Sequence, residues 1–188
     1  LRCLTNTDDT AVAAAFDFVQ LTFPNTVLPK TADTALLRDA LAARLRRPLR
    51  VCGMVKNEGE PGGGPFWVRE VDGNVSVQIV ESAEVDSSDQ TQQAVLRQAT
   101  HFNPVFMALG VRDERGQPFD LRRFVDQDRA IITRKPYADT VATVLERPGL
   151  WNGAMAGWNS VFVEVPLDVF SPVKSVLDLL RPEHQMPV

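Results

Sequence analysis

The sequence predicts an α/β protein with a mixed sheet and flanking helices, and three observations support this prediction. Apolar residues recur at helical spacing in some segments, whereas other segments are short apolar runs typical of strands. The two kinds of segment alternate irregularly, which favours a mixed sheet over a doubly wound parallel one. The 188 residues are 44% hydrophobic and 23% charged, so the chain can bury a core of ordinary globular size.

The amino-terminal part, residues 1–48, is predicted to be helical. A first helix is expected over 8–22, with Thr7 or Asp8 as its N-cap, and a second helix over 32–46. Each has one apolar face, so the pair is expected to cover the rest of the chain or to form an arm. The apolar positions are Val12, Ala15, Phe16, Val19 and Phe23 in the first helix, and Leu36, Leu37, Leu41 and Leu45 in the second.

Residues 49–188 are predicted to form the mixed α/β domain. The Asp72-Gly73 pair between two apolar runs indicates a tight hairpin turn. Strands are expected over 49–56, 66–71, 75–81, 130–133, 140–145 and 161–165. Helices are expected over 88–99 with Ser87 or Ser88 as N-cap, over 119–125, and from the Phe170-Ser171-Pro172 segment to Leu180.

Charge and cysteine content exclude several classes of protein. The net charge of -4 gives no footprint for a nucleic-acid backbone, and no stretch reaches the roughly 20 apolar residues of a membrane span. Cys3 and Cys52 are the only thiols, and neither has the neighbours of a disulfide framework or a zinc site. The expected location is therefore the cytoplasm. The chain begins without Met, which indicates processing, trimming or a fragment.

An arginine cluster leaves two interpretations open. Four arginines lie close together around Pro48, at the end of the second predicted helix. They form either a solvated helix end, where cations suit the negative end of the dipole, or an anion site. The four are Arg44, Arg46, Arg47 and Arg50.

The most unusual local feature is the loop that contains Gly62, Gly63 and Gly64. Three glycines let the backbone approach another group closely with its N–H groups free to donate, although the surrounding sequence matches neither a Walker loop nor a Rossmann fingerprint. The alternative is a wide hairpin or crossover loop. Further along, His101 and Asn103 stand in a His-Phe-Asn-Pro segment. The proline holds Asn103 extended, so its amide could meet a backbone group or a sugar hydroxyl.

Two Trp-Asn pairs and one lysine complete the candidates. Trp151-Asn152 and a second pair seven residues later offer indole faces for a sugar or base and amides for hydroxyl groups. The alternative is a loop anchored in the core. Lys174 is expected in the first turn of the last helix, where a cation is unfavourable and so suggests an anionic partner. That partner is a ligand, or Glu164 or Asp168.

Three stretches resemble a known family. They are the run from Val51 to Val68 with the glycine loop, the segment from Thr100 to Pro104, and the segment from Leu150 to Met155. They look like the carboxy-terminal part of an uncharacterised bacterial family, a domain of unknown function. Members of that family are much longer, which implies an amino-terminal half that is absent here.

A weaker resemblance concerns nucleotidyltransferases. The Asp72-Gly73 turn and the run from Val77 to Val85 are similar to a hairpin of the UDP-sugar pyrophosphorylases, and the Phe-Ser-Pro-Val-Lys run ending at Lys174 looks like the Phe-Ser-Pro-Leu-Lys motif of the UDP-N-acetylhexosamine pyrophosphorylases. The resemblance implies a partial nucleotide-diphospho-sugar transferase-like fold, with Lys174 near phosphates and Glu81 near the sugar. The His101 segment resembles a sugar-contacting stretch only loosely.

Two hypotheses of function follow. In the first, the chain is the carboxy-terminal part of a sugar-nucleotide-binding, nucleotidyltransferase-like enzyme that is catalytically incomplete alone, since it has one plausible lysine and no predicted metal ligands. Its ligand would be a sugar nucleotide or phosphorylated sugar, with Mg²⁺ if it is catalytic. In the second, the chain is a non-catalytic binding or assembly module. It would then dock a protein partner, a second copy or its own missing half.

Overall fold

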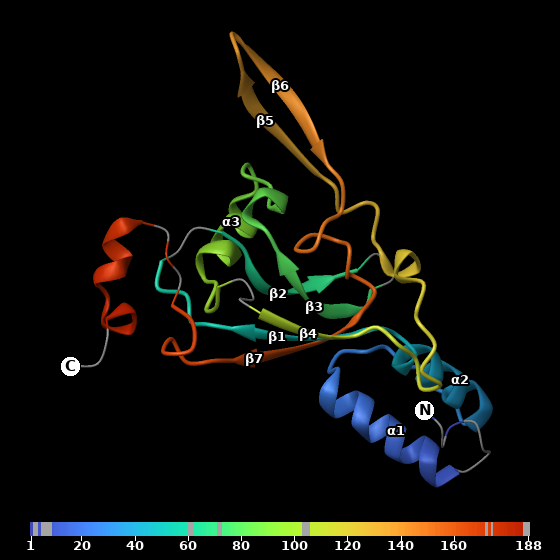
Figure 1. Cartoon of the computed structure of the whole chain (residues 1–188). Helices are drawn as coiled ribbons and strands as arrows, with labels where there is room; N and C mark the ends of the chain where they lie inside the picture. The colour runs from blue at the N-terminus through green and yellow to red at the C-terminus, as the bar shows by residue number, and fades with distance from the viewer. Residues whose placement is uncertain are drawn as a thin grey trace.

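A three-stranded mixed sheet lies at the centre of the computed structural model (Figure 1). The structure describes residues 1, 4, 9–59, 62–70, 73–102, 106–171, 173 and 175–185. The central strand β1 (Leu49–Met54) pairs antiparallel with β4 (Phe106–Gly110) and parallel with β7 (Asn159–Glu164). The mixed α/β fold class predicted from the sequence is therefore confirmed.

Two hairpins accompany this sheet. Strand β2 (Gly64–Arg69) pairs with β3 (Val75–Val80), and Gly73 in the turn between them has a φ of 84° that favours glycine. The predicted turn residue Asp72 lies outside the described residues. Strand β5 (Ile131–Tyr137) pairs with β6 (Thr140–Glu146), and this second hairpin projects away from the body of the molecule (Figure 1).

The two amino-terminal helices pack against each other. Helix α1 (Asp9–Thr22) and helix α2 (Thr34–Leu45) share an apolar cluster built on Leu4, Val12, Val19 and Leu41. The Asp33 carboxylate caps α2 by accepting from the backbone N–H groups of Ala35 and Leu36. The predicted caps of the first helix, Thr7 and Asp8, lie outside the described residues.

Two predictions of helices are wrong in detail. Helix α3 (Gln90–Arg97) is capped by Asp89 rather than by either serine, because the Asp89 carboxylate accepts from two free N–H groups, while Ser88 bonds to Asp86. The last predicted helix is replaced by two short 3₁₀ turns, η4 (Val176–Leu180) and η5 (Pro182–His184). Ser175 and Asp178 form a capping box, so η4 starts later than expected. Two more such turns are η2 (Ser82–Glu84) and η3 (Leu121–Phe124).

A buried arginine joins the sheet to the first hairpin. Arg50 on β1 is 2% exposed, and its guanidinium donates to Ser160 Oγ at 2.7 Å and to Gln78 Oε1 at 3.1 Å. Gln78 on β3 in turn donates to the Ala156 carbonyl at 3.0 Å. Burial lowers the pKa of Arg50. These bonds connect β1, β3, β7 and the loop before β7 in one network.

The solvated-helix-end interpretation is wrong for Arg50 and also for Arg44. The Arg44 guanidinium lies 4.4 Å from the centre of the Phe23 ring and donates to Thr26 Oγ1 and to Asn159 Oδ1. Burial, and then the neighbouring charge of Arg47, lower the pKa of Arg44 to about 10. Arg46 does fit a helix end at the surface, since it is half-exposed and pairs with Glu114 at 2.7 Å.

The chain exposes more surface than a compact protein of its mass. Its accessible surface is 12,581 Å² for 20.8 kDa, whereas a compact monomer of that mass exposes about 8,900 Å². The projecting hairpin contributes, since Ile132 is 70% and Leu145 61% exposed. Among the described residues, no helix is long and apolar enough to cross a membrane.

The Arg50 network yields a first prediction. Replacing Gln78 with Leu removes the acceptor of a buried guanidinium and the donor to the Ala156 carbonyl, so Gln78→Leu should lower the free energy of unfolding by about 2–4 kcal/mol. Chemical denaturation followed by circular dichroism measures this change. Combining it with Arg50→Met should recover part of the loss, because the uncompensated buried charge is then gone.

The exposed Gln117 provides the matched control. Gln117→Leu should change the free energy of unfolding by no more than about 0.5 kcal/mol. An equally small effect of Gln78→Leu, or a double variant less stable than the sum of both single losses, would contradict the role assigned to this network.

Candidate functional site

Several of the predicted site residues meet at one edge of the structure. Strands β1 and β7 are parallel and both end there, at Met54 and Glu164. The hairpin β2–β3 reaches the same edge, because Gly64 starts β2 and pairs with Val80, directly before Glu81. We call this group the carboxyl-edge cluster; its members are Lys56, Gly62, Gly63, Gly64, Glu81, His101 and Glu164.

The backbone around His101 is held against the end of β1. His101 forms an isolated antiparallel bridge with Lys56, and Phe102 N donates to the Val55 carbonyl at 2.9 Å. Asn57 N donates to the Thr100 carbonyl at 3.0 Å. This segment therefore extends the sheet by a short antiparallel step, which fixes the direction of the imidazole.

The imidazole of His101 lies between a hydroxyl and a carboxylate. Its Nδ1 is 2.9 Å from Thr100 Oγ1, and its Nε2 is 2.9 Å from Glu164 Oε2. Lys56 Nζ approaches the other oxygen of the same carboxylate, Oε1, at 3.8 Å. The hydrogen bond from His101, followed by the charge of Lys56, lowers the pKa of Glu164. At neutral pH this carboxylate is ionised and accepts hydrogen bonds.

The glycine loop packs against the His101 segment. A Cβ atom on Gly64 would stand 2.6 Å from the His101 carbonyl oxygen, and one on Gly62 would stand 3.1 Å from the Phe102 ring. Gly62 also has a φ of 145°. Two of the three glycines are thus explained by close packing within the chain, which agrees with the crossover-loop alternative.

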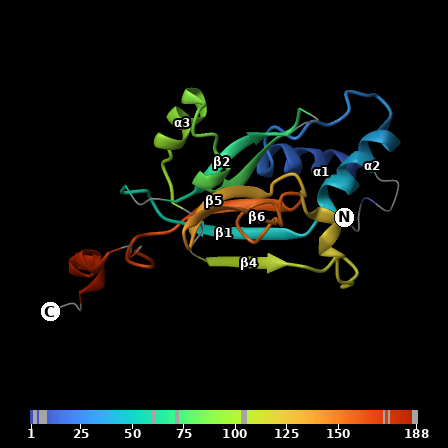
Figure 2. The same cartoon turned by 90° about the horizontal axis from the view of Figure 1, so that it is seen from above.

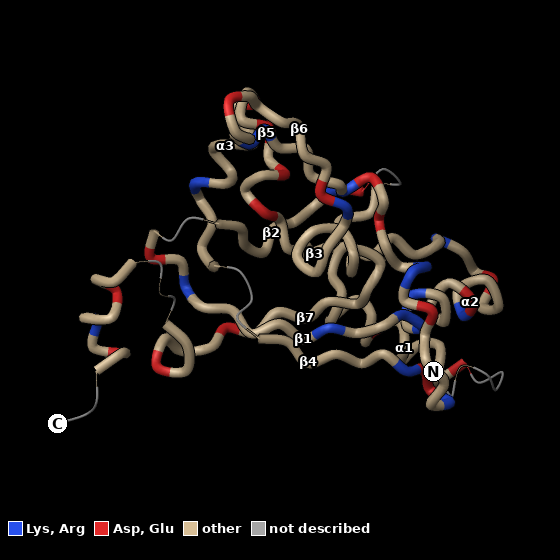
Figure 3. Tube along the Cα trace, turned by 45° about the horizontal axis from the view of Figure 1, so that its top comes forward, with Lys and Arg blue, Asp and Glu red and all other residues tan. Residues whose placement is uncertain are grey.

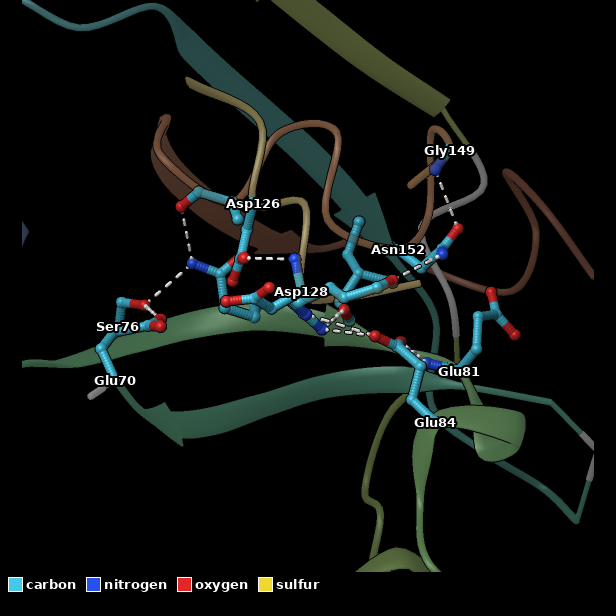
Figure 4. Close-up of polar contacts among 12 residues, drawn as sticks. Glu70, Ser76, Glu81, Glu84, Asp126, Asp128, Gly149 and Asn152 are labelled. Carbon is cyan, nitrogen blue, oxygen red and sulfur yellow. Dashed lines mark hydrogen bonds and ion pairs between the residues drawn. The ribbon is translucent and has the colours of Figure 1, made fainter. Parts of the chain in front are cut away.

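Glu81 and Asn152 belong to a polar network beside this edge (Figure 4). Glu81 N donates to Glu84 Oε2 at 2.8 Å, and Glu84 Oε1 pairs with Arg129 at 3.0 Å. Asn152 Nδ2 donates to the Arg129 carbonyl at 3.0 Å, while its Oδ1 accepts from Gly149 N at 3.1 Å. The Asn152 amide holds the turn around Gly149, and the neighbouring Trp151 is partly buried in that turn.

Two predicted residues cannot be placed. Asn103 and Lys174 lie outside the described residues, so their proximity to the glycine loop stays a prediction. The described 3₁₀ turn η4 begins at Val176 with Ser175 as its N-cap, so its first turn lies after position 174. In the part of the chain that the structure describes, no group of three or more His, Cys, Asp or Glu side chains could hold a metal ion.

The sequence pointed only indirectly to Lys56 and Glu164. Lys56 appeared as the end of a strand before the glycine loop, and Glu164 as a partner for Lys174. Their pairing depends on β1 and β7 lying side by side in parallel register, with Met54 opposite Glu164. Met54, the last residue of β1, and Asn159, the first residue of β7, are 105 positions apart in the sequence. No short sequence pattern predicts the register between strands so far apart.

The bond between His101 and Glu164 yields a second prediction. A carboxylate whose folded pKa is lowered keeps its stabilising contacts above its ordinary pKa and loses them as pH falls through the folded value. In His101→Ala the pKa of Glu164 should therefore rise toward the ordinary glutamate value, as measured by carboxyl-carbon NMR titration. Thr100→Val keeps the Nε2 contact and should leave it low. An unchanged Glu164 pKa in His101→Ala would show that the contact is absent in solution.

Comparisons with known proteins give a family and distant structural matches. No curated protein matches the chain. A solved structure of a mutant UDP-glucose pyrophosphorylase from Leishmania major, in complex with UDP-glucose, matches with a TM-score of 0.43 and 18% sequence identity. The match covers 80% of this chain and 33% of that one, so this chain spans about a third of the length of that relative. Residues 3–185 match the family described as Domain of unknown function (DUF4301), and the chain belongs to that family.

Proposed function

We propose that the chain is the sugar-binding and phosphate-binding part of a nucleotidyltransferase-like enzyme, and that its ligand meets the carboxyl-edge cluster. The observation that carries this proposal is the convergence of Gly64, Glu81 and His101 at one edge, beside Lys56 and Glu164. These positions are far apart in the sequence. The sequence alone predicts three of them, Gly64, Glu81 and His101, as ligand contacts.

The position of the cluster in the fold supports a ligand site. In open α/β sheets, ligands bind outside the carboxyl ends of parallel strands, and β1 and β7 both end at this edge. The Glu81 and Glu164 carboxylates can accept hydrogen bonds from sugar hydroxyls. Lys56, which is mostly exposed, can donate to a phosphate, and we expect Lys174 and Asn103 to reach the same ligand.

The chemistry of phosphoryl transfer limits what this chain can do alone. The transfer needs cationic groups and Mg²⁺ around the phosphates, with the substrate held in line. Lys56 and Lys174 would supply charge, and the carboxylates would orient the sugar. We therefore propose a role in binding and orientation, with catalysis depending on further residues.

The third prediction concerns ligand affinity. In calorimetric titrations of the longest available form of the protein with glucose 1-phosphate and with UDP-glucose plus Mg²⁺, Lys174→Ala and Glu81→Gln should each weaken binding about tenfold or more. Each variant removes one charge-assisted hydrogen bond to the ligand. The matched controls are Lys135→Ala and Glu146→Gln, which remove an ion pair on the projecting hairpin.

Unchanged affinity in Lys174→Ala would remove the phosphate role of that lysine. Equal losses in the hairpin controls would show that the effect is general rather than local to the carboxyl-edge cluster.

A second candidate function, an assembly module, is favoured by the uncovered apolar surface. On one face of the β5–β6 hairpin, Ile132 pairs with Leu145 and Pro136 pairs with Val141, and all four are exposed. A two-stranded hairpin is only marginally stable without a packed face. The 3₁₀ turn η4 exposes Val176, Leu177, Leu179 and Leu180 as well.

The fourth prediction tests this second function. If the hairpin face mediates assembly, the chain should self-associate in light-scattering chromatography, and the double variant Ile132→Thr with Leu145→Thr should reduce the associated fraction while the melting temperature changes little. Both side chains are exposed, so their loss removes few contacts within the chain. A monomeric chain whose melting temperature rises with UDP-glucose and Mg²⁺ would contradict assembly and favour ligand binding.

A further inference from the structure

A second region with the properties of a ligand site lies at the opposite edge of the sheet. A pocket of about 740 Å³ opens at the amino ends of β1 and β7, within the size range of small-molecule sites. Strand β1 has six residues, which places this pocket about 20 Å from the carboxyl-edge cluster. The pocket contains none of the residues of that cluster.

Four stretches of the chain line the pocket. Helix α2, with the chain before and after it, forms one wall, and the turn end of the β2–β3 hairpin and residues 123–128 form the other; residues 156–158 complete the lining. Val27 N donates to Asn74 Oδ1 at 3.0 Å, which ties the first wall to the hairpin. Gly157 N donates to the Phe124 carbonyl at 2.9 Å, which closes the floor. Small-molecule sites are common where two such units meet.

The charges of the two walls differ. Arg44 and Arg47 stand on the α2 wall, and Arg44 is held in place by Asn159 and by the Phe23 ring. Glu70, Asp126 and Asp128 line the opposite wall, together with Arg123. Basic and acidic positions accordingly lie close together around α2 in Figure 3.

The acidic residues of the pocket are separate from the polar network around Glu81 and Asn152. In Figure 4, Glu70, Ser76 and Asp126 lie at one end of β3, whereas Glu81 and Asn152 lie at the other. Glu70 accepts from Ser76 Oγ at 3.0 Å, and Asp126 accepts from Asp128 N at 3.0 Å. The Asp128 carboxylate and the Arg123 guanidinium have no hydrogen bond or ion pair with any side chain or backbone group that the structure describes. Both are therefore available to a ligand.

We propose that this pocket binds a small molecule that has a compact anionic group at one end and an ammonium group at the other. Guanidinium groups recognise phosphate or carboxylate in a fork geometry, and Arg47 supplies one at the α2 wall. The carboxylates of the opposite wall attract a cation and accept from hydroxyl groups. Trp158 and Phe124 provide apolar surface between the walls. An amino sugar phosphate satisfies all of these requirements.

This inference goes beyond the proposed function, because it assigns a second site with its own residues. Glucosamine 6-phosphate is the probe, and binding is followed by tryptophan fluorescence and by calorimetry. Trp158 lines the pocket, so its emission should change on binding, and Trp158→Phe should abolish that change.

Two variants and one partial ligand, glucose 6-phosphate, separate the contributions of the walls. Arg47→Ala should weaken glucosamine 6-phosphate and glucose 6-phosphate alike, about tenfold or more, because both carry the phosphate. Asp128→Asn should weaken only glucosamine 6-phosphate, because glucose 6-phosphate lacks the ammonium group. Arg134→Ala and Asp139→Asn, exposed on the projecting hairpin, are the matched controls.

Two results of these titrations would overturn the inference. Absence of binding, or binding that Arg47→Ala and Asp128→Asn leave intact, overturns the inference. Binding that is lost in Glu81→Gln or Lys174→Ala but kept in the pocket variants assigns the probe to the carboxyl-edge cluster, and also overturns it. The proposed function is judged separately, by glucose 1-phosphate and UDP-glucose.

Discussion

The buried guanidinium of Arg50 ties the β2–β3 hairpin to the three-stranded sheet, with which that hairpin shares no strand pairing. It lies on the central strand and bonds to Ser160 on β7 and to Gln78 on β3. A buried charge is expensive unless its donors are satisfied, so the hairpin, the sheet and the loop at Ala156 must keep one mutual arrangement. The positions of the residues in the carboxyl-edge cluster and in the pocket at the opposite edge both depend on that arrangement.

The two edges of the sheet have different chemistry because the same strands present different residues at their two ends. At the carboxyl ends of β1 and β7, Glu164 is ionised and is held by His101 and Lys56. At the amino ends, α2 brings arginines toward the acidic turn of the β2–β3 hairpin. We propose a sugar with a phosphate as the ligand of the first arrangement, and a ligand with charges of both signs for the second.

The chain exposes an open strand edge and an apolar hairpin face to solvent. The three-stranded sheet has β4 at its outer edge in Figure 2, and the β5–β6 hairpin extends into solvent with apolar side chains on one face. Such surfaces are rarely left uncovered, because apolar area in contact with water and open strand edges promote association. Ligand binding at the edges and assembly through these faces are compatible, since they use different residues.

The sequence by itself determined the fold class, most strands and the helical pair, because these depend on local periodicity and turn residues. It could not reveal that Arg50 is buried and Arg44 half-buried, because an arginine beside a helix end is ordinarily solvated. It also placed the last helix wrongly: the chain forms a 3₁₀ turn over Val176–Leu180 with none of these residues buried, and the sequence does not show whether a surface is there to cover them. Only the tertiary structure decided that Lys56, His101 and Glu164 meet, and that α2 faces the β2–β3 turn. Contacts between residues so far apart depend on strand register and packing, which no short stretch of sequence encodes.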